Sequence, residues 1–310
     1  MIDIVVSYVY ERDKKWNQEF HYWKEKEILE HKTSKDNRQA FGVERTREWD
    51  CFKYWFRGIE NNCPWINKIF LVVQNENHIP KWLNRNNPKL RIVFHEEYIP
   101  KKLLPTFNAM PIGMYLSNIQ DLSNNYIISD DDYYFLNPIK EDRFFRDGKP
   151  VHLDNKIGYG LYDTTGQAKV WWQILNNDLM FEESLNLPKI KYAIYHLPEA
   201  RSKKNEQDII HNNEQEILNH FITSKFRHES NLCSYMFSDI LKLQNKVVWD
   251  NPYKNCAYCT LKSDVNFNDY WNKDIVCFND TEVLDDFNLT KKKLIDFLEK
   301  KFPNKSSYEV

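Results

Sequence analysis

Three adjacent aspartates follow a short apolar run near the middle of the chain. Residues 126–129 read Tyr-Ile-Ile-Ser and lead directly into Asp130, Asp131 and Asp132. Neighbouring carboxylates repel one another, so a cation is their natural partner, and hard oxygen ligands suit Mg²⁺ or Mn²⁺. Such a metal, held by Asp131 and Asp132, could bridge the diphosphate of a nucleotide. The alternative is a solvated acidic turn, in which Asp130 serves only as a turn or capping residue.

Basic side chains form a second candidate group upstream of the aspartates. Lys53 and Arg57 are four residues apart, so on a helix they project from one face. Two cations side by side match the charge of a pyrophosphate, and Arg45, a little earlier in the chain, could join them. A solvated helix face explains the same spacing, so the pattern alone leaves both interpretations open.

A histidine stands just before a proline in the second half of the chain. His196 precedes Leu197-Pro198, and basic residues beginning with Arg201 follow. A histidine beside cations can act as a general base or donate a hydrogen bond to an anion. A lone histidine can equally be structural. Two further polar pairs are ambiguous in the same way: Arg227-His228 and Asn279-Asp280.

Apolar, β-branched runs indicate the strands that would position these residues. They cover residues 2–9, 68–73, 90–94 and 126–129, and each has the length of a strand. Residues 47–61 carry apolar side chains at every third or fourth position, which predicts an amphipathic helix. Strands that alternate with helices favour a parallel sheet covered on both faces. Sheets of this kind bind ligands beyond the carboxyl ends of their strands.

We therefore expect an α/β fold with a Rossmann-like, mainly parallel sheet in residues 1–150. Residues 151–310 would form the second half, with a smaller, mostly helical lobe that completes the site. The charged residues 24–38 indicate a loop or an exposed helical insertion. Residues 290–302 predict a basic amphipathic helix, which either packs one face on the core or rests on an anionic membrane surface.

The composition excludes several classes of protein. Lysine plus arginine (43) nearly balance aspartate plus glutamate (45), and a net charge of -2 provides no positive field to hold nucleic acid. The apolar runs are far shorter than the roughly 20 residues that a membrane-spanning helix needs. Six cysteines are too few for a disulfide scaffold, and no secretory leader follows Met1. We expect a cytoplasmic protein with reduced thiols.

Short motifs occur in a fixed order along the chain. Those of the first half are Arg57-Gly58-Ile59-Glu60, Cys63-Pro64-Trp65-Ile66, Lys68-Ile69-Phe70-Leu71-Val72, Pro80-Lys81-Trp82-Leu83-Asn84, Leu104-Pro105-Thr106-Phe107-Asn108 and Asp131-Asp132. Those of the second half are His196-Leu197-Pro198 with Arg201, and Cys277-Phe278-Asn279-Asp280. Together with the opening residues up to Asp13 and Trp16, they resemble the four conserved blocks of the Stealth family. This family of sugar-phosphate transferases includes bacterial capsular and cell-wall polysaccharide phosphotransferases and the lysosomal N-acetylglucosamine-1-phosphotransferase.

The resemblance implies an enzyme of capsular or cell-wall polysaccharide synthesis with a nucleotide-sugar-binding core. It would transfer a hexose or N-acetylhexosamine 1-phosphate from a UDP-sugar to a glycan hydroxyl, forming a phosphodiester and releasing UMP. The acceptor would be a glycan or a lipid-linked oligosaccharide, the latter at the inner face of the plasma membrane.

The resemblance also implies roles for individual residues. Catalytic roles fall to His196, Asp131, Asp132 and Arg57, with Mg²⁺ or Mn²⁺ on the two aspartates, and either aspartate rather than His196 could be the general base. The residues implied to bind substrate or nucleotide are Asp3, Asp13, Arg45, Lys53, Asn108, Arg201, Arg227, Asn279 and Asp280.

The sequence departs from the family pattern at three places, and it leaves two other functions open. Asp130 stands where the family has asparagine, Tyr10-Glu11 replaces an Asp/Asn-Gly pair, and Asn231 replaces an acidic residue. The acidic triplet fits equally well a metal-dependent glycosyltransferase that moves the sugar itself and releases UDP. The many tryptophans and tyrosines would suit a non-catalytic carbohydrate-binding module, in which they serve as stacking platforms.

Overall fold

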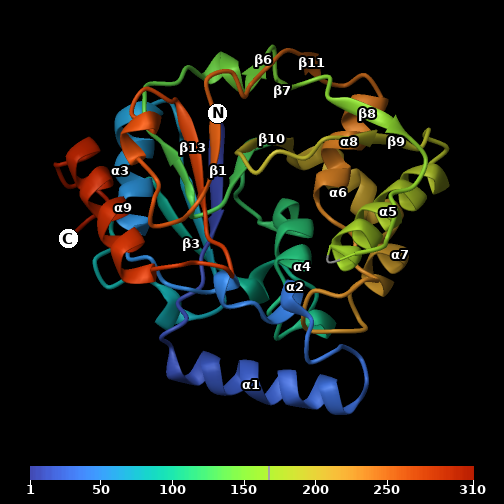
Figure 1. The fold of residues 1–310 in the computed structure, drawn as a ribbon. Coiled ribbons are helices and arrows are strands. Elements are labelled where there is room, and N and C mark those ends of the chain that lie inside the picture. Colours follow the sequence, from blue (N-terminus) through green and yellow to red (C-terminus); the bar gives the residue numbers. More distant parts are fainter. Residues whose placement is uncertain (167) are drawn as a thin grey trace.

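A five-stranded sheet lies at the centre of the computed structural model (Figure 1), which describes residues 1–166 and 168–310. Its strand order is β10-β4-β1-β2-β3, and all neighbours are parallel except β10, which is antiparallel to β4. The strands are β1 (Ile2–Ser7), β2 (Ile69–Val73), β3 (Leu90–Phe94), β4 (Asn125–Ser129) and β10 (Glu199–Ser202). The α/β class, the mainly parallel sheet and all four strands predicted from the apolar runs are confirmed.

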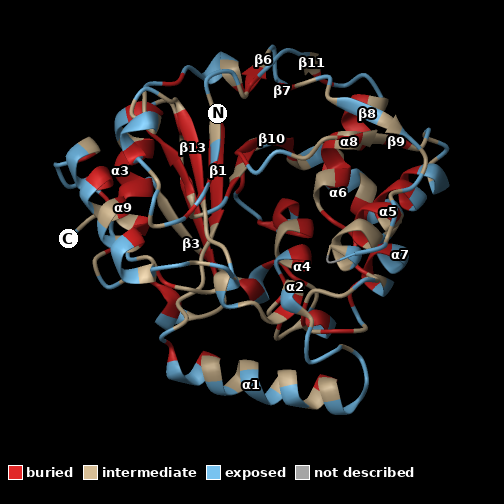
Figure 2. Cartoon of the chain, viewed as in Figure 1, coloured by how far each residue is buried: buried red, intermediate tan, exposed pale blue. Residues whose placement is uncertain are grey.

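Helices cover both faces of this sheet, and the strand interiors are buried (Figure 2). Helices α3 (Phe52–Asn62) and α9 (Phe287–Lys301) pack on the face that contains Ile69 and Leu71. Helix α4 (Ala109–Met114) packs on the opposite face. Because side chains alternate between the faces of a strand, a sheet covered on both sides requires an uninterrupted apolar run such as β2.

The second half of the chain supplies strands as well as helices. Its helical part corresponds to the expected lobe and consists of α5 (Lys169–Ser184), α6 (Lys203–Asn212), α7 (Glu214–Asn219) and α8 (Tyr235–Leu243). Strand β10 joins the central sheet, and β13 (Ile275–Asn279) pairs with β5 (Tyr133–Phe135) from the first half. The remaining strands are β6 (Phe145–Arg146), β7 (Lys149–His152), β8 (Lys156–Tyr159), β9 (Ile190–Tyr192), β11 (Val248–Trp249) and β12 (Ala257–Thr260). The two halves therefore share sheets.

The connection between β1 and α3 is more ordered than the sequence predicted. It contains α1 (Lys14–Leu29), which lies at one end of the molecule and buries only Trp16 and Glu27 (Figures 1 and 2), and the short α2 (Arg38–Phe41). Residues 33–49, here called the α1–α3 segment, then contribute to the cavity described below. The predicted helix start at residue 47 is wrong. Asp50 has φ 56°, a left-handed conformation that a right-handed helix cannot include, so α3 begins at Phe52.

The C-terminal helix packs one face on the core. Leu294, Phe297 and Leu298 of α9 are buried against the sheet and α3. Several of its lysines bond to the protein itself, since Lys291 Nζ donates to the Glu48 carbonyl at 3.0 Å and Lys293 Nζ to the Ser263 carbonyl at 2.7 Å. The packing interpretation of this helix is thus confirmed, and its use at a membrane stays a prediction. In the described part of the chain, no helix has the length and apolar character needed to cross a bilayer.

Glu182, on the inner side of α5, carries a buried carboxyl group whose two oxygens have no hydrogen-bond partner among the described residues. Burial, followed by the nearby charges of Asp239 and Asp178, raises its pKa to about 10. The folded protein therefore holds a proton there at neutral pH. When folding raises the pKa of a carboxyl group, the protonated group contributes fully to stability below the pKa of the unfolded state. That contribution is lost as the pH rises through the pKa of the folded state.

We expect Glu182→Gln, which mimics the protonated group, to stabilise the protein more at high pH than at low pH. The free energy of unfolding should rise by roughly 1–3 kcal/mol at pH 8 and change little near pH 4.5, because the wild-type carboxyl is then protonated in both states. Denaturant titrations at the two pH values check this. An equal effect at both would show that the charge of Glu182 is not the cause.

Candidate functional site

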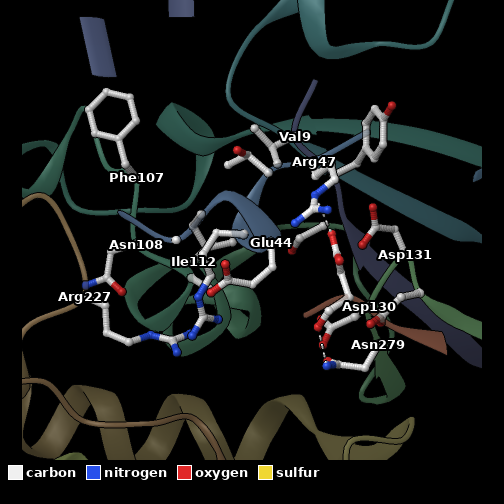
Figure 3. Close-up of a pocket in the computed structure, with 18 of the residues that line it drawn as sticks. Val9, Glu44, Arg47, Phe107, Asn108, Ile112, Asp130, Asp131, Arg227 and Asn279 are labelled. Atoms are coloured by element: carbon white, nitrogen blue, oxygen red, sulfur yellow. Dashed lines mark hydrogen bonds and ion pairs between the residues drawn. The ribbon is translucent and has the colours of Figure 1, made fainter. Parts of the chain in front are cut away.

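A cavity of about 850 Å³ opens at the carboxyl ends of the parallel strands. Its walls come from both halves of the chain and include the ends of β1 and β4, the α1–α3 segment, and loops around residues 196, 227 and 279. Asp130, Asp131 and Asn279 lie on one side of it and Arg227 on the other, with Glu44 between them (Figure 3). The cavity therefore lies beyond the strand ends, where the sequence predicted the site.

The acidic turn directly follows β4. The backbone of Asp132 is tied to β13, since its carbonyl accepts from the Phe278 N–H at 3.0 Å. Burial, then the charge of Asp130, raises the pKa of Asp131 to about 7, and the same two causes raise the pKa of Asp132 well above its ordinary value. Asp132 Oδ2 accepts a bond from the Cys277 thiol at 3.5 Å, whereas Oδ1 is buried without a partner. The turn thus brings together carboxyl groups whose charged forms are destabilised, as the raised pKa values of Asp131 and Asp132 show.

This turn fits a divalent cation that takes some of its ligands from the protein and the others from a bound substrate. In the part of the chain that the structure describes, no group of three or more His, Cys, Asp or Glu side chains is placed to hold a metal. Mg²⁺ commonly takes one or two carboxylates and completes its shell with phosphate oxygens and water. Asp131 and the free oxygen of Asp132 provide the two carboxylates.

Two guanidinium groups meet on the opposite side of the cavity. Gln39 Oε1 accepts from Arg45 Nη2 at 2.8 Å and from Arg227 Nη1 at 2.9 Å. Neither arginine forms an ion pair with a carboxylate among the described residues. Burial lowers the pKa of both, and the charge of Arg45 contributes to lowering that of Arg227 to about 9. Two guanidiniums at this spacing, neither of them in an ion pair among the described residues, could bind an anion between them.

The pKa of His196 is affected by charges of both the acidic turn and the arginine pair. Its imidazole lines the cavity and is exposed to it, and its ring stands perpendicular to that of Tyr258 at 5.9 Å. Burial lowers its pKa, Asp130 opposes this, and Arg45 and Arg227 lower it further. The ring is therefore neutral near pH 7, as a general base requires.

Comparisons with known proteins identify the family of the chain. Residues 45–152 match the family model described as "Stealth protein CR2, conserved region 2". Over its length the chain is 30% identical to the capsular polysaccharide phosphotransferase WcwK of Streptococcus pneumoniae, and the match covers 99% of this chain and 98% of that protein. The chain belongs to the Stealth family.

Other relatives extend this result. This Stealth protein is 27% identical to the receptor polysaccharide phosphotransferase WefC of Streptococcus gordonii, with 100% and 99% of the two chains covered. A crystal structure of the galactosyltransferase LgtC matches with a TM-score of 0.41 and 9% identity, over 98% of each chain. Membership of the family makes the chain a transferase with a phosphotransfer role, and the alternative of a non-catalytic carbohydrate-binding module falls away.

The structure brings part of the predicted Stealth site together. The predicted residues that line the cavity are Arg45, Asn108, Asp131, Asp132, His196, Arg201, Arg227, Asn279 and Asp280. Two of them are engaged elsewhere. Arg201 is buried between Glu199 and Glu206, at 3.0 and 3.4 Å, and the Asn108 amide donates to the Phe226 carbonyl and to Asn231.

Asp280 and Asn279 serve the wall of the cavity. The Asp280 carboxylate accepts from Trp49 Nε1 at 3.0 Å and pairs with Arg47 Nε at 3.2 Å, so it anchors the α1–α3 segment. Asn279 donates to the Asp280 carbonyl at 2.6 Å, and it lines the cavity together with His196.

Four predicted residues lie outside the cavity, which corrects their expected placement. Asp3, at the opposite end of β1, accepts from the backbone N–H groups of Lys68 and Ser123 at 3.1 and 2.7 Å, so it fixes the start of the sheet. Asp13 caps α1 through the Lys15 N–H at 3.0 Å. Lys53 extends over the ring of Tyr54. The fourth is Arg57.

Arg57 connects α3 to the end of the chain. Its guanidinium donates to both carboxylate oxygens of Glu309, at 2.7 and 2.8 Å, and to the Phe302 carbonyl at 2.6 Å. The side chains of Arg57 and Glu309 are only 4% and 3% exposed. With its donors engaged in this way, Arg57 has no geometry for a phosphate, and the expectation that it is catalytic is corrected by its position.

We expect Arg57→Ala to destabilise the Stealth protein by about 3–5 kcal/mol, since it leaves the Glu309 carboxylate buried without its partner. The kcat per folded molecule should not change. Lys53→Ala, on the same helix, is the matched control and should alter neither quantity. Thermal unfolding and active-site titration of the folded fraction separate the two effects. A folded Arg57→Ala protein without activity would restore a catalytic role for this residue.

Sequence reasoning missed three cavity residues of the α1–α3 segment, Gln39, Glu44 and Arg47. Arg47 carried a signal, because it lies two residues from Arg45 in a segment that leads to a helix. Gln39 and Glu44 carried none, since single polar residues in a charged stretch look like ordinary surface.

Proposed function

We propose that this Stealth protein transfers a sugar 1-phosphate from a UDP-sugar to a hydroxyl of a glycan or lipid-linked oligosaccharide in the cytoplasm. The product would be a phosphodiester of a capsular or cell-wall polysaccharide, and UMP would leave. One observation supports this most directly: across one cavity, the acidic turn faces two guanidiniums that form no ion pair with any carboxylate of the described residues. A nucleotide diphosphate bound with a divalent cation would match both walls. The phosphotransferase names of the full-length relatives support the same chemistry.

In the proposed reaction the acceptor oxygen attacks the phosphorus next to the sugar. The bond from that phosphorus to the bridging oxygen breaks, and the electron pair leaves with UMP. Arg45 and Arg227 would bind the non-bridging oxygens and balance the charge that develops on them in the transition state. His196 Nδ1 or Nε2 would take the proton of the acceptor hydroxyl.

The cation would neutralise phosphate oxygens as a Lewis acid when bound. Asp131 and Asp132 are the residues that would hold it. A lipid-linked acceptor would bring the protein to the inner face of the plasma membrane, where the remaining lysines of α9 could contact anionic headgroups.

The nucleotide released by the reaction tests the proposal. Purified protein is incubated with a panel of UDP-sugars, Mg²⁺ or Mn²⁺, and glycan acceptors, and nucleotides and products are analysed by chromatography and ³¹P NMR. We expect UMP and a new phosphodiester signal in equal amounts. Release of UDP with a glycoside product would instead identify a metal-dependent glycosyltransferase and contradict the proposal.

A further inference from the structure

One neutral side chain lies between the two cationic groups of the cavity. Gln39, on α2, places its amide oxygen within hydrogen-bond distance of both Arg45 and Arg227, at 2.8 and 2.9 Å. The two arginines are far apart in the sequence, and Arg227 reaches the contact from the second half of the chain (Figure 3). Because both neighbours can only donate, the acceptor end of the amide must face them.

The neutrality of Gln39 has an electrostatic consequence. An amide oxygen satisfies a donor on each guanidinium and leaves both positive charges in place. The nearest acidic neighbour on the segment, Glu44, favours the charged form of Arg45 without forming an ion pair with it. A carboxylate in the position of Gln39 would pair with both arginines and cancel the attraction of the site for anions.

The position of Gln39 is fixed from both sides of the cavity. On one side, Asn37 Nδ2 donates to the Arg227 carbonyl at 3.4 Å. On the other side, Arg38 pairs with Glu282 and Arg47 Nη2 donates to the Thr281 carbonyl at 3.3 Å. The α1–α3 segment thus connects the loop of Arg227 to the loop after β13, and α2 lies between these attachments.

We propose that Gln39 is a positioning residue, which holds Arg45 and Arg227 at the spacing of one phosphate oxygen and is displaced by such an oxygen when a diphosphate binds. The amide oxygen stands where an anionic oxygen of the ligand will stand. The inference rests on the proposed function only for the identity of the anion as the diphosphate of a nucleotide.

Three variants test this in the full-length protein with UDP as the probe. Gln39→Glu puts a carboxylate of the same shape between the arginines. We expect the Kd for UDP to rise at least about tenfold, because a charged hydrogen-bond partner must now be displaced. The Tm of the ligand-free protein should rise by about 2–4 °C, because the carboxylate compensates two cations.

Gln39→Ala should raise the Kd by about threefold without raising the Tm, since it removes the side chain that aligns the two arginines and adds no competitor for the ligand. Gln120→Glu adds the same charge at an exposed position and should change neither value.

Higher stability with weaker binding is the distinguishing result for Gln39→Glu. If Gln39 only filled space, both substitutions at this position would lower the Tm, and that outcome overturns the proposal. Unchanged UDP affinity in Gln39→Glu, or wild-type protein that binds neither UDP nor pyrophosphate, also overturns it. Failure of the phosphotransferase proposal is read separately, from UDP rather than UMP as the product, and leaves the binding results intact.

Discussion

Asp131→Asn is expected to lower kcat by roughly 100- to 1000-fold while the protein remains folded. The substitution keeps the shape of the side chain and removes the charge that would hold the cation. In the absence of a cation, burial and Asp130 raise the pKa of Asp131 to about 7. The neutral amide should therefore leave the Tm of the metal-free protein equal or higher, because it relieves this repulsion.

The metal dependence of the Tm separates charge from folding in this experiment. Wild-type protein should gain Tm on addition of Mn²⁺ with UDP, and Asp131→Asn should lose most of that gain. Asp208→Asn, at an exposed position of α6, is the control and should behave as wild type. Full activity of Asp131→Asn would remove the acidic turn from the proposed mechanism.

Arg227→Ala should have an effect of similar size through a different step. Removing one of the two guanidiniums should raise the Kd for UDP at least about tenfold and lower kcat/KM by roughly 1000-fold, because the lost contact also acts on the transition state. The free protein should not lose stability, since Arg227 has a lowered pKa caused by burial and by Arg45. Its removal relieves an unfavourable charge.

Titration calorimetry with UDP and initial-rate kinetics measure the two parts. Arg227→Lys should recover binding only in part, because a lysine cannot present the planar set of donors. Arg85→Ala removes the same side chain from an exposed pair with Glu76 and should change neither Kd nor kcat/KM. If Arg227→Ala bound UDP as tightly as wild type, the arginine pair would not be the diphosphate site.

The sequence predicted those parts of the molecule that local patterns determine. The buried strands are continuous apolar runs, and the acidic turn follows β4 as expected for the carboxyl end of a parallel strand. The helix before β2 was also predicted, but its start was not. Asp50 adopts a left-handed backbone conformation there, and no pattern in the neighbouring residues predicts it.

Local patterns could not predict contacts between residues that are far apart in the sequence. Lys53 and Arg57 have ideal helical spacing for a diphosphate, yet Arg57 binds Glu309, which is 252 positions away. The family resemblance placed Asp3, in the first predicted strand, near the nucleotide, but its carboxylate instead accepts from backbone groups at the opposite end of the sheet. Conversely, Gln39 could not be predicted as a site residue, because one of its two partners, Arg227, is brought to it by the fold from the other half of the chain.

The shared sheets also determine when during synthesis the site can form. A nascent chain that has left the ribosome through Asp132 already carries the acidic turn, Arg45 and Gln39. It lacks Arg227 and also β13, the strand that fixes the backbone of Asp132 and leads into Asn279. Folding must then close loops of more than a hundred residues, which is slow compared with local helix formation. Nucleotide affinity should therefore arise only near the end of translation, and partial chains would not sequester nucleotide.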